Sequence, residues 1–336
     1  MSNRKIIVLT PVRNEAWILD RFLTVCSLFA DHIIIADQNS SDGSLEIYSK
    51  YHKVYLINNN NANFNEADRQ TLLLNAAREK FGIGNILLAI DADEILSANA
   101  MQSLEWSSML NAKVGSILFF EKPTFLKNTS TVIRYNGKGW PLGYIDDGAI
   151  HKPTQIHSTR IPTPEYAENI YFSEIKFLHY ALVRLDAQAS KERMYSMLEN
   201  IKKTKSLRLR LRHYNSQNDR SSEGDAHNKS DPSWFYNWDN LGIDMHTITS
   251  SNYYWYDFEC LKLFNNYGIN RFMLDDIWNF DWEKCRIHSL GMKYEHNPSF
   301  KIKNKFIFIT NFIISQIRSF DDMALGFKKL FKGGAR

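Results

Sequence analysis

Short apolar runs alternate with amphipathic stretches along the first half of the chain. The clearest run, Ile86–Ile90, is five apolar residues long and leads directly into the acidic segment 91–94. A continuous apolar run of this length is typical of a strand buried on both faces, as in a parallel sheet between helices. Similar runs end near Pro11, Asp37 and Ile57, and helical spacing fills the segments between them. This alternation predicts a doubly wound, mostly parallel α/β sheet.

The later part of the chain has a different character. Residues 208–233 are polar and contain few apolar positions, which predicts a long exposed loop. Most Trp and Tyr residues follow that loop, and we expect helices there. Helices are expected over 13–23, 44–51, 65–81, 97–110 and 186–205, and further strands over 115–121 and 131–135. The predicted domains are an α/β domain over 1–205, an exposed polar loop over 206–233 and an aromatic-rich helical C-terminal extension over 234–336.

Composition excludes several classes of protein. An apolar fraction of 44%, a charged fraction of 23% and a net charge of +4 are ordinary for a globular chain and give no indication of a nucleic-acid partner. The cysteines Cys26, Cys260 and Cys285 lack the spacing of a metal cluster or a disulfide framework, which predicts a reducing, cytoplasmic environment. The polar start is unlike a signal peptide, and Phe306–Ile317 is too short and too polar to span a bilayer.

Polar motifs follow three of the predicted strands. They occupy residues 10–15, 37–43 and 91–94. Because the carboxyl ends of parallel strands meet at one edge of a sheet, these motifs are expected to surround one ligand. The crowded carboxylates at 91–94 repel one another, which predicts a compensating cation, most simply a divalent metal carrying a phosphorylated ligand. The alternative is an acidic first turn of a helix after the strand.

The ordered motifs resemble those of the family 2 glycosyltransferases with the fold called GT-A. That family has Pro-x-x-Asn-Glu after its first strand, Asp-x-x-Ser-x-Asp-Gly after its second and Asp-x-Asp after its fourth, matching 11–15, 37–43 and 91–93 here. The resemblance covers roughly residues 4–200. It is closest to bacterial enzymes of lipopolysaccharide-core and capsule assembly, on Ala-Asp-Arg-Gln at 67–70, His-Tyr at 179–180 and Lys-Glu-Arg-Met-Tyr at 191–195.

The resemblance implies a nucleotide-diphosphate sugar, most simply a UDP-sugar, as donor. Asp37 would accept a hydrogen bond from the base, Glu15 and Asp91 would take ribose hydroxyls, and Arg69 would pair with the diphosphate. The alternatives are that Asp37 caps a helix, that Glu15 is a first-turn carboxylate and that Arg69 is a solvated surface charge. The residues expected to bind the donor are Thr10, Pro11, Asn14, Glu15, Asp37, Arg69 and Asp91.

Asp93 is the expected metal ligand, for Mg²⁺ or Mn²⁺. His179 is a second expected ligand, which would favour Mn²⁺ because imidazole is a softer donor than a carboxylate. The alternative is that His179 has only a structural role, since it follows an apolar segment. The metal would neutralise the departing diphosphate.

An inverting transfer also needs a base for the acceptor hydroxyl. Asp146 and Asp147 lie where the family places that base, and two adjacent carboxylates raise one pKa; the alternative is a polar turn before Gly148. His151 is a second candidate. The relatives have Val-His-Glu here, whereas this chain has Ala-Ile-His-Lys at 149–152.

The predicted function is therefore a metal-dependent inverting glycosyltransferase that acts on a surface-glycan or lipid-linked acceptor. The segment 306–332 mixes apolar clusters with Lys and Arg, which fits either peripheral contact with the inner face of a membrane or an ordinary terminal helix. A sugar nucleotidyltransferase is a second possibility, but the loop at 10–15 lacks the glycines of that class. A non-catalytic glycan-binding or scaffold protein is a third possibility. The Glu that is missing after His151 favours it, and the intact Asp-x-Asp at 91–93 argues against it.

Overall fold

The chain divides into two compact units in the computed structural model. The structure describes residues 4–59, 65–133, 139–154, 158–214, 227–290, 308 and 310–320. The α/β unit comprises 1–183 and 221–249, and the helical unit comprises 184–220 and 250–336. The sequence predicted boundaries near 205 and 233 instead. The observed boundaries differ from the predicted ones because helix α5 (Leu185–Lys202) packs with α8 (Trp255–Tyr267). Trp234 and Trp238, by contrast, are buried in the core of the α/β unit.

The strands of the α/β unit form one mixed sheet. Among the described residues, its order is β11-β8-β7-β10-β6-β9-β4-β1-β2-β3, and β5 pairs with β10. The strands β3, β2, β1 and β4 are parallel, whereas β9 runs antiparallel to both β4 and β6. The strands are β1 (Ile6–Val12), β2 (His32–Asp37), β3 (Val54–Asn58), β4 (Ile86–Ala89), β5 (Glu94–Leu96), β6 (Ile117–Glu121), β7 (Thr124–Leu126), β8 (Asn128–Ile133), β9 (Trp140–Ile145), β10 (Asn169–Leu182) and β11 (His227–Lys229).

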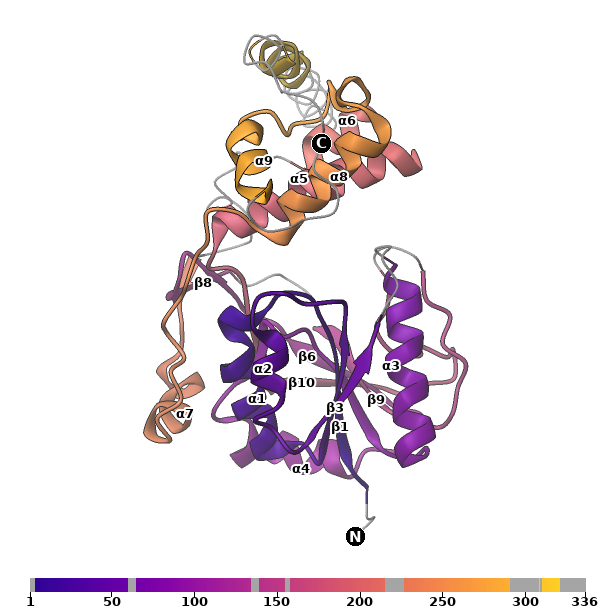
Figure 1. Cartoon of the computed structure of the whole chain (residues 1–336). Helices are drawn as coiled ribbons and strands as arrows, with labels where there is room; N and C mark the ends of the chain where they lie inside the picture. The colour runs from indigo at the N-terminus through magenta and orange to yellow at the C-terminus, as the bar shows by residue number, and fades with distance from the viewer. Residues whose placement is uncertain are drawn as a thin grey trace, which may run out of the picture. The chain divides into compact units, whose positions relative to one another are not determined.

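Helices cover both faces of the parallel strands. The apolar side of α1 packs on one face and that of α3 on the other (Figure 1). Strands β1, β2 and β4 are buried on both faces, which explains their continuous apolar runs and confirms the predicted α/β class. The helices of this unit are α1 (Ala16–Phe29), α2 (Ser44–Tyr48), α3 (Glu66–Phe81), α4 (Leu104–Leu110) and α7 (Tyr236–Asn240), with the 3₁₀ turns η1 (Ala100–Gln102) and η3 (Pro232–Trp234).

Two elements differ from the sequence prediction in this unit. Glu94 opens strand β5, and the helix expected over 97–110 is split into η1 and α4. The split falls at Ser103, whose hydroxyl accepts a hydrogen bond from Trp106 N at 3.2 Å and so caps α4. The strand expected over 131–135 is β8, and positions 134 and 135 lie outside the described residues.

The helical unit has its own aromatic core. Phe264 packs against Trp278 and Trp282, which are nearly fully buried. The exposed loop predicted over 206–233 is wrong at its start, because Ser206 caps helix α6 (Leu207–His213) and Arg210 is buried against Asp275 at 2.9 Å. The other elements are η4 (Ile269–Phe272), α9 (Trp282–Leu290) and the helical residues 310–320.

The described helices do not meet the requirements for crossing a membrane. None of them combines the length and the apolar character that a membrane span requires. The membrane contact considered for 306–332 falls largely on residues outside the described ranges. The three cysteines are buried free thiols.

Candidate active site

The loops after β1 and β2 are tied to each other at the carboxyl edge of the sheet. Asn14 N donates to Ser40 Oγ at 2.9 Å, and Ser41 N donates back to Asn14 Oδ1 at 2.7 Å. Asn14 has a φ of 56°, a left-handed conformation that Asn tolerates better than most residues. Asn14 therefore fixes the relative position of the two loops predicted to hold the donor.

Asp37 lies at the end of β2 and is almost fully buried. Its two carboxylate oxygens accept from Ser40 N and from the Tyr48 hydroxyl, each at 2.9 Å. Burial and the neighbouring Asp37 charge raise the pKa of Tyr48 well above its ordinary value, so this phenol stays a donor. The neighbouring Asp42 accepts from Ala16 N at 2.9 Å and from Ser44 N at 3.2 Å, so it links the start of α1 to the start of α2.

The other residues predicted to bind the donor lie at the same edge. Thr10 is fully buried within β1, and Pro11 pairs in register with Ala36 of β2. Glu15 is the N-cap residue of α1, and its carboxylate accepts from Trp17 Nε1 at 2.6 Å. Arg69 lies in the first turn of α3, which begins at this edge of the sheet.

The acidic segment after β4 surrounds an arginine that sequence reasoning did not find. Arg160 Nη2 lies 2.5 Å from Asp91 Oδ2, and Arg160 Nη1 lies 2.5 Å from Glu94 Oε2. Nη1 also donates to Ala89 O at 3.3 Å. The guanidinium thus joins the end of β4 to both carboxylates. The sequence predicted a cation beside these crowded carboxylates. For Asp91 and Glu94, that cation is the Arg160 side chain.

Glu94 is the buried centre of this network. Its side chain is 0% exposed, and Lys122 Nζ pairs with its Oε1 at 2.9 Å. Burial opposes ionisation of Glu94, but the charges of Arg160 and Lys122 hold its pKa well below the usual range. The alternative of an acidic first helix turn is therefore wrong for Glu94, which begins strand β5 and pairs with Arg160 and Lys122.

Asp93 and His179 form a second pair beside this network. Asp93 Oδ2 and His179 Nε2 are 3.7 Å apart, and Tyr180 N donates to Asp93 O at 2.9 Å. His179 Nδ1 contacts Thr124 Oγ1 at 3.1 Å, an interaction that fixes the ring with Nε2 towards Asp93. Thus β5, β7 and β10 together hold the two predicted metal ligands next to each other.

This pair fits one divalent ion. Metal–oxygen and metal–nitrogen bonds are about 2.0–2.2 Å long, so a single ion spans two donors that lie 3.7 Å apart. The described residues contain no group of three or more acidic, His or Cys side chains that would hold a metal. A metal at this pair would therefore complete its coordination with ligand oxygens and water, as expected at a phosphate-binding site.

Asp146 and Asp147 do not lie with the other predicted site residues. Strand β9 runs antiparallel to β4 with Ile145 opposite Ile86, and Asp146 N donates to Asn85 O at 2.9 Å. Both carboxylates therefore lie at the amino edge of the parallel strands, roughly 20 Å along the strand direction from Asp91 at about 3.3 Å per residue. The prediction that either carboxylate is the base is wrong for a reaction at the carboxyl edge.

The contacts of the two carboxylates also argue against a role as the general base. Asp146 is fully buried and accepts three hydrogen bonds from Arg78, the shortest of them 2.7 Å from Nη2. Burial of Asp147 is outweighed by hydrogen bonds from Tyr144 and Tyr166, so the pKa of Asp147 is lowered. A general base at neutral pH needs a raised carboxyl pKa, which is the opposite direction.

His151 lies closer to the acidic network. The backbone of Thr159, the residue before Arg160, hydrogen-bonds to the His151 ring. Burial lowers the pKa of His151, and the nearby Arg78 charge acts in the same direction, so the imidazole is neutral at pH 7. A neutral imidazole is able to accept a proton, and the role of His151 as the base stays a prediction.

Comparisons with known proteins agree with this geometry. Residues 7–105 match the family model described as Glycosyl transferase family 2. This segment of the chain is similar to that family, and the match does not extend past residue 105. It contains the loops held by Asn14, the buried Asp37 and the acidic segment after β4. The predicted enzyme class, glycosyltransferase, is confirmed, as is the GT-A type of α/β fold.

Similarities to solved structures are weaker. Residues 1–349 of TarS from S. aureus are 11% identical at a TM-score of 0.38, covering 82% of this chain and 82% of that chain. Glucosyl-3-phosphoglycerate synthase from Mycobacterium tuberculosis, in complex with Mn²⁺, UDP and glucosyl-3-phosphoglycerate, is 18% identical at a TM-score of 0.25, covering 37% and 45%. A nucleotidyl transferase from Methanothermobacter thermautotroptrophicus is 14% identical at a TM-score of 0.28, covering 42% and 71%. No curated protein matched.

Proposed function

We propose that this glycosyltransferase transfers a sugar from a nucleotide-diphosphate donor, most simply a UDP-sugar, with inversion and with the help of a divalent metal. The observation that carries the proposal is the placement of Asp37, Asp91 and the Asp93–His179 pair along one edge of the parallel strands. An elongated donor with a base, a ribose and a diphosphate matches this order. The proposed acceptor is a surface-glycan or lipid-linked chain on the cytoplasmic side.

In this proposal the base and the ribose lie over β1 and β2. The two loops that Asn14 joins form a rigid surface beneath the donor, and Asp37 accepts a hydrogen bond from the nucleotide base. Asp91 accepts from a ribose hydroxyl, while Arg160 holds its Oδ2 atom and so orients the carboxylate. We assign Arg160 as a positioning residue, because its guanidinium is anchored on the buried Glu94.

The diphosphate lies towards Asp93 and His179. A bound Mn²⁺ or Mg²⁺ would supply positive charge to the leaving diphosphate there. His179 presents Nε2 to this position because Thr124 contacts Nδ1, and we assign Arg69, at the start of α3, to the diphosphate. Arg160 and Lys122 add two further positive charges next to the acidic segment, which reduces repulsion between the carboxylates and the incoming phosphates.

The remaining step is removal of the proton from the attacking acceptor hydroxyl. With Asp146 and Asp147 at the opposite edge, His151 is the remaining candidate of the three predicted from the sequence. Its pKa is lowered by burial, which leaves the ring neutral and able to accept the proton at pH 7.

Thermal unfolding tests this proposal. UDP with Mn²⁺ should raise the melting temperature of the chain by several degrees, because a ligand that binds only the folded state stabilises it by about 2.7 kcal/mol at 100 times its Kd. UDP alone and Mn²⁺ alone should have much smaller effects, and CMP should serve as the control nucleotide. If no nucleoside diphosphate shifts the melting temperature with metal present, the proposed donor class is wrong.

A further inference from the structure

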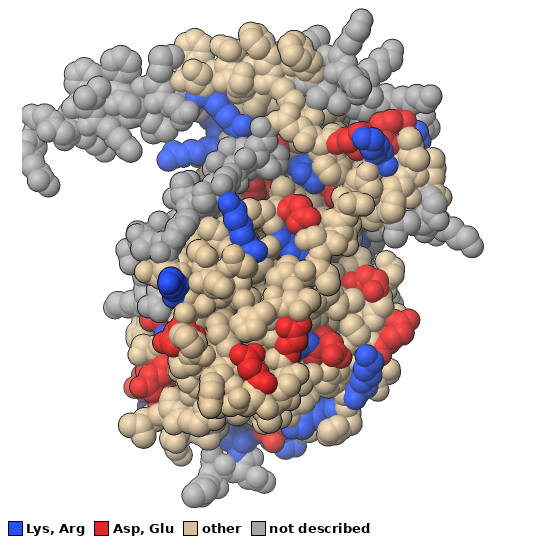
Figure 2. All heavy atoms as spheres, turned by 90° about the vertical axis from the view of Figure 1, so that its left-hand side faces the viewer, with Lys and Arg blue, Asp and Glu red and all other residues tan. Residues whose placement is uncertain are grey.

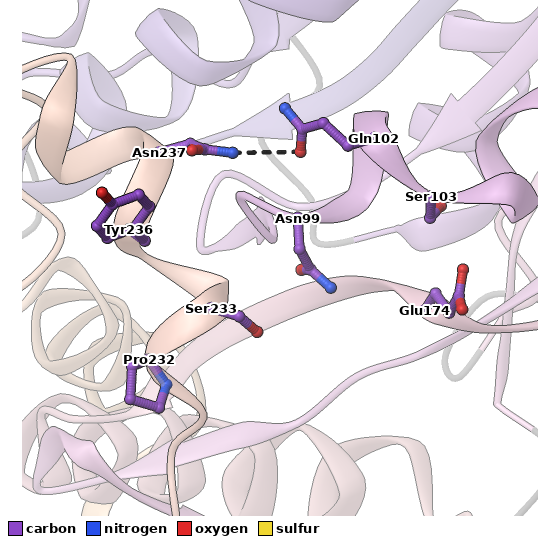
Figure 3. Close-up of a pocket in the computed structure, with 8 residues that line it drawn as sticks. All are labelled: Asn99, Gln102, Ser103, Glu174, Pro232, Ser233, Tyr236 and Asn237. Atoms are coloured by element: carbon purple, nitrogen blue, oxygen red, sulfur yellow. Dashed lines mark hydrogen bonds between the residues drawn. The ribbon is translucent and has the colours of Figure 1, made fainter.

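A polar pocket lies in the α/β unit apart from the proposed donor site. Its volume is about 740 Å³, which falls within the range of small-molecule sites. Three segments that are far apart in the sequence meet there, namely η1, β10 and the segment from η3 to α7 (Figure 3). The lining residues are Asn99, Gln102, Ser103, Glu174, Pro232, Ser233, Tyr236 and Asn237.

The walls of the pocket are held in place by buried contacts. Trp238 Nε1 donates to Leu96 O at 2.8 Å, and Ala98 N donates to Trp234 O at 2.8 Å. Asn237 Nδ2 donates to Gln102 Oε1 at 3.2 Å across the pocket rim. The chain returns from the helical unit through 227–249 to make these contacts, so the pocket is a product of tertiary structure rather than of one loop.

Glu174 enters the pocket because β10 is irregular at this point. The pairing of β10 with β6 shifts register between Phe172 and Lys176. The Glu105 carboxylate accepts from Ser173 N and Glu174 N at 3.0 and 2.6 Å, which fixes the irregular turn. Such bulges redirect side chains and occur often next to binding sites.

The chemistry of the lining selects one class of ligand. It offers three carboxamides, three hydroxyls and one carboxylate, with Pro232 and the ring of Tyr236 as apolar surface. Neither Lys nor Arg is among the lining residues, so phosphates and other anions would meet no compensating charge. Among the described residues on the face shown in Figure 2, Lys and Arg side chains are scattered and form no large basic patch. Amide and carboxylate groups suit the vicinal hydroxyls of a neutral sugar.

Asn99 provides a second indication of a ligand. Its side chain projects into the space between Ser233 and Glu174 (Figure 3). Its Oδ1 atom is buried and accepts no hydrogen bond from the described residues. An unsatisfied buried acceptor costs about 1–3 kcal/mol, which a ligand hydroxyl would recover once the Asn99 side chain turns towards it.

We propose that this pocket binds neutral sugar residues of the glycan acceptor. The inference rests on the proposed function, because it assigns a place to the acceptor half of the reaction. Glu94 of the acidic network and Asn99 of the pocket are five residues apart, which limits their separation to about 17 Å at 3.3–3.4 Å per residue. A short oligosaccharide is long enough to span this separation.

Binding of the labelled chain to an array of neutral and anionic oligosaccharides from bacterial surface glycans tests this proposal. Wild type should bind neutral glycans, and Tyr236→Ala and Asn99→Ala should weaken that binding at least about tenfold, the effect of losing about 1.4 kcal/mol. Tyr171→Ala is the matched control, since Tyr171 is an exposed aromatic residue of the same unit outside the pocket. All three variants should keep the stabilisation by UDP and Mn²⁺, which shows that they are folded.

The outcomes separate this proposal from the proposed function. The glycan site would be overturned if the wild-type chain bound no neutral glycan or bound anionic glycans alone. Equal binding of neutral glycans by wild type and Tyr236→Ala would overturn it as well. Glycan binding that depends on Tyr236 in a chain that UDP and Mn²⁺ do not stabilise would support the pocket and contradict the nucleotide-sugar donor.

Discussion

Replacing Asp93 by Asn should reduce sugar transfer at least about 100-fold, the effect of removing one strong electrostatic contact from a transition state. Asn keeps the size of the side chain but removes the charge that would hold a cation beside His179 Nε2, 3.7 Å away. The measurement is the initial rate of transfer from a radiolabelled UDP-sugar at saturating Mn²⁺. The fall should appear in kcat, because the lost charge acts on the leaving diphosphate.

Asp20→Asn is the matched control for this variant. Asp20 is an exposed carboxylate of helix α1 in the same unit, and its side chain is 61% accessible. Its replacement should change the rate less than about twofold, as is usual for surface substitutions worth under 0.5 kcal/mol. Transfer by Asp93→Asn within threefold of wild type would show that Asp93 has no part in metal binding.

Replacing Arg160 by Met should both destabilise the chain and weaken donor binding. Removal of one partner from a buried ion pair costs about 3–5 kcal/mol, and of the two basic side chains paired with Glu94 Lys122 would remain. Asp91 would lose the contact that orients its carboxylate, so the KM for the donor should rise at least about tenfold while kcat changes less. Arg160→Lys should restore part of the donor affinity.

Arg78→Met is the control variant that separates the loss of stability from the loss of donor binding. Arg78 pairs with the buried Asp146 at 2.7 Å, but at the opposite edge of the sheet. This control should lose a similar free energy of unfolding in urea titrations and keep the donor KM of wild type. Equal KM values for the two variants would mean that Arg160 has only a structural role.

The parallel half of the sheet could be predicted from the sequence alone. Apolar runs such as Ile86–Ile90 identify strands buried on both faces, and the carboxyl-edge rule then places Asp37, Asp91 and Asp93 together. The rule works because three parallel strands, β2, β1 and β4, are neighbours in the sheet. It needs no knowledge of loops or of distant partners.

The antiparallel strand β9 explains why the predicted base was misplaced. Asp146 and Asp147 were candidates because they lie between the Asp-x-Asp and the His-Tyr motifs, where the resembled family usually places its base. Because β9 is inserted between β4 and β6 in the reverse direction, its end lies beside Asn85 at the opposite edge. No local signal in the sequence gives the direction of a strand.

Residues that act through distant partners were also missed. Arg160 is 69 positions from Asp91, and Arg210 is 65 positions from Asp275. Both lie in segments whose local composition is polar, so they resemble solvated charges. The uncompensated charge at 91–94 did predict a nearby cation, but not which residue supplies it.

Diffraction at the manganese absorption edge is the most direct test of the central claim. Crystals grown with MnCl₂ and UDP should show one strong anomalous peak between Asp93 and His179, with the diphosphate on it and the uracil beside Asp37. A peak away from this pair, or UDP bound away from the carboxyl ends of β1, β2 and β4, would contradict the account.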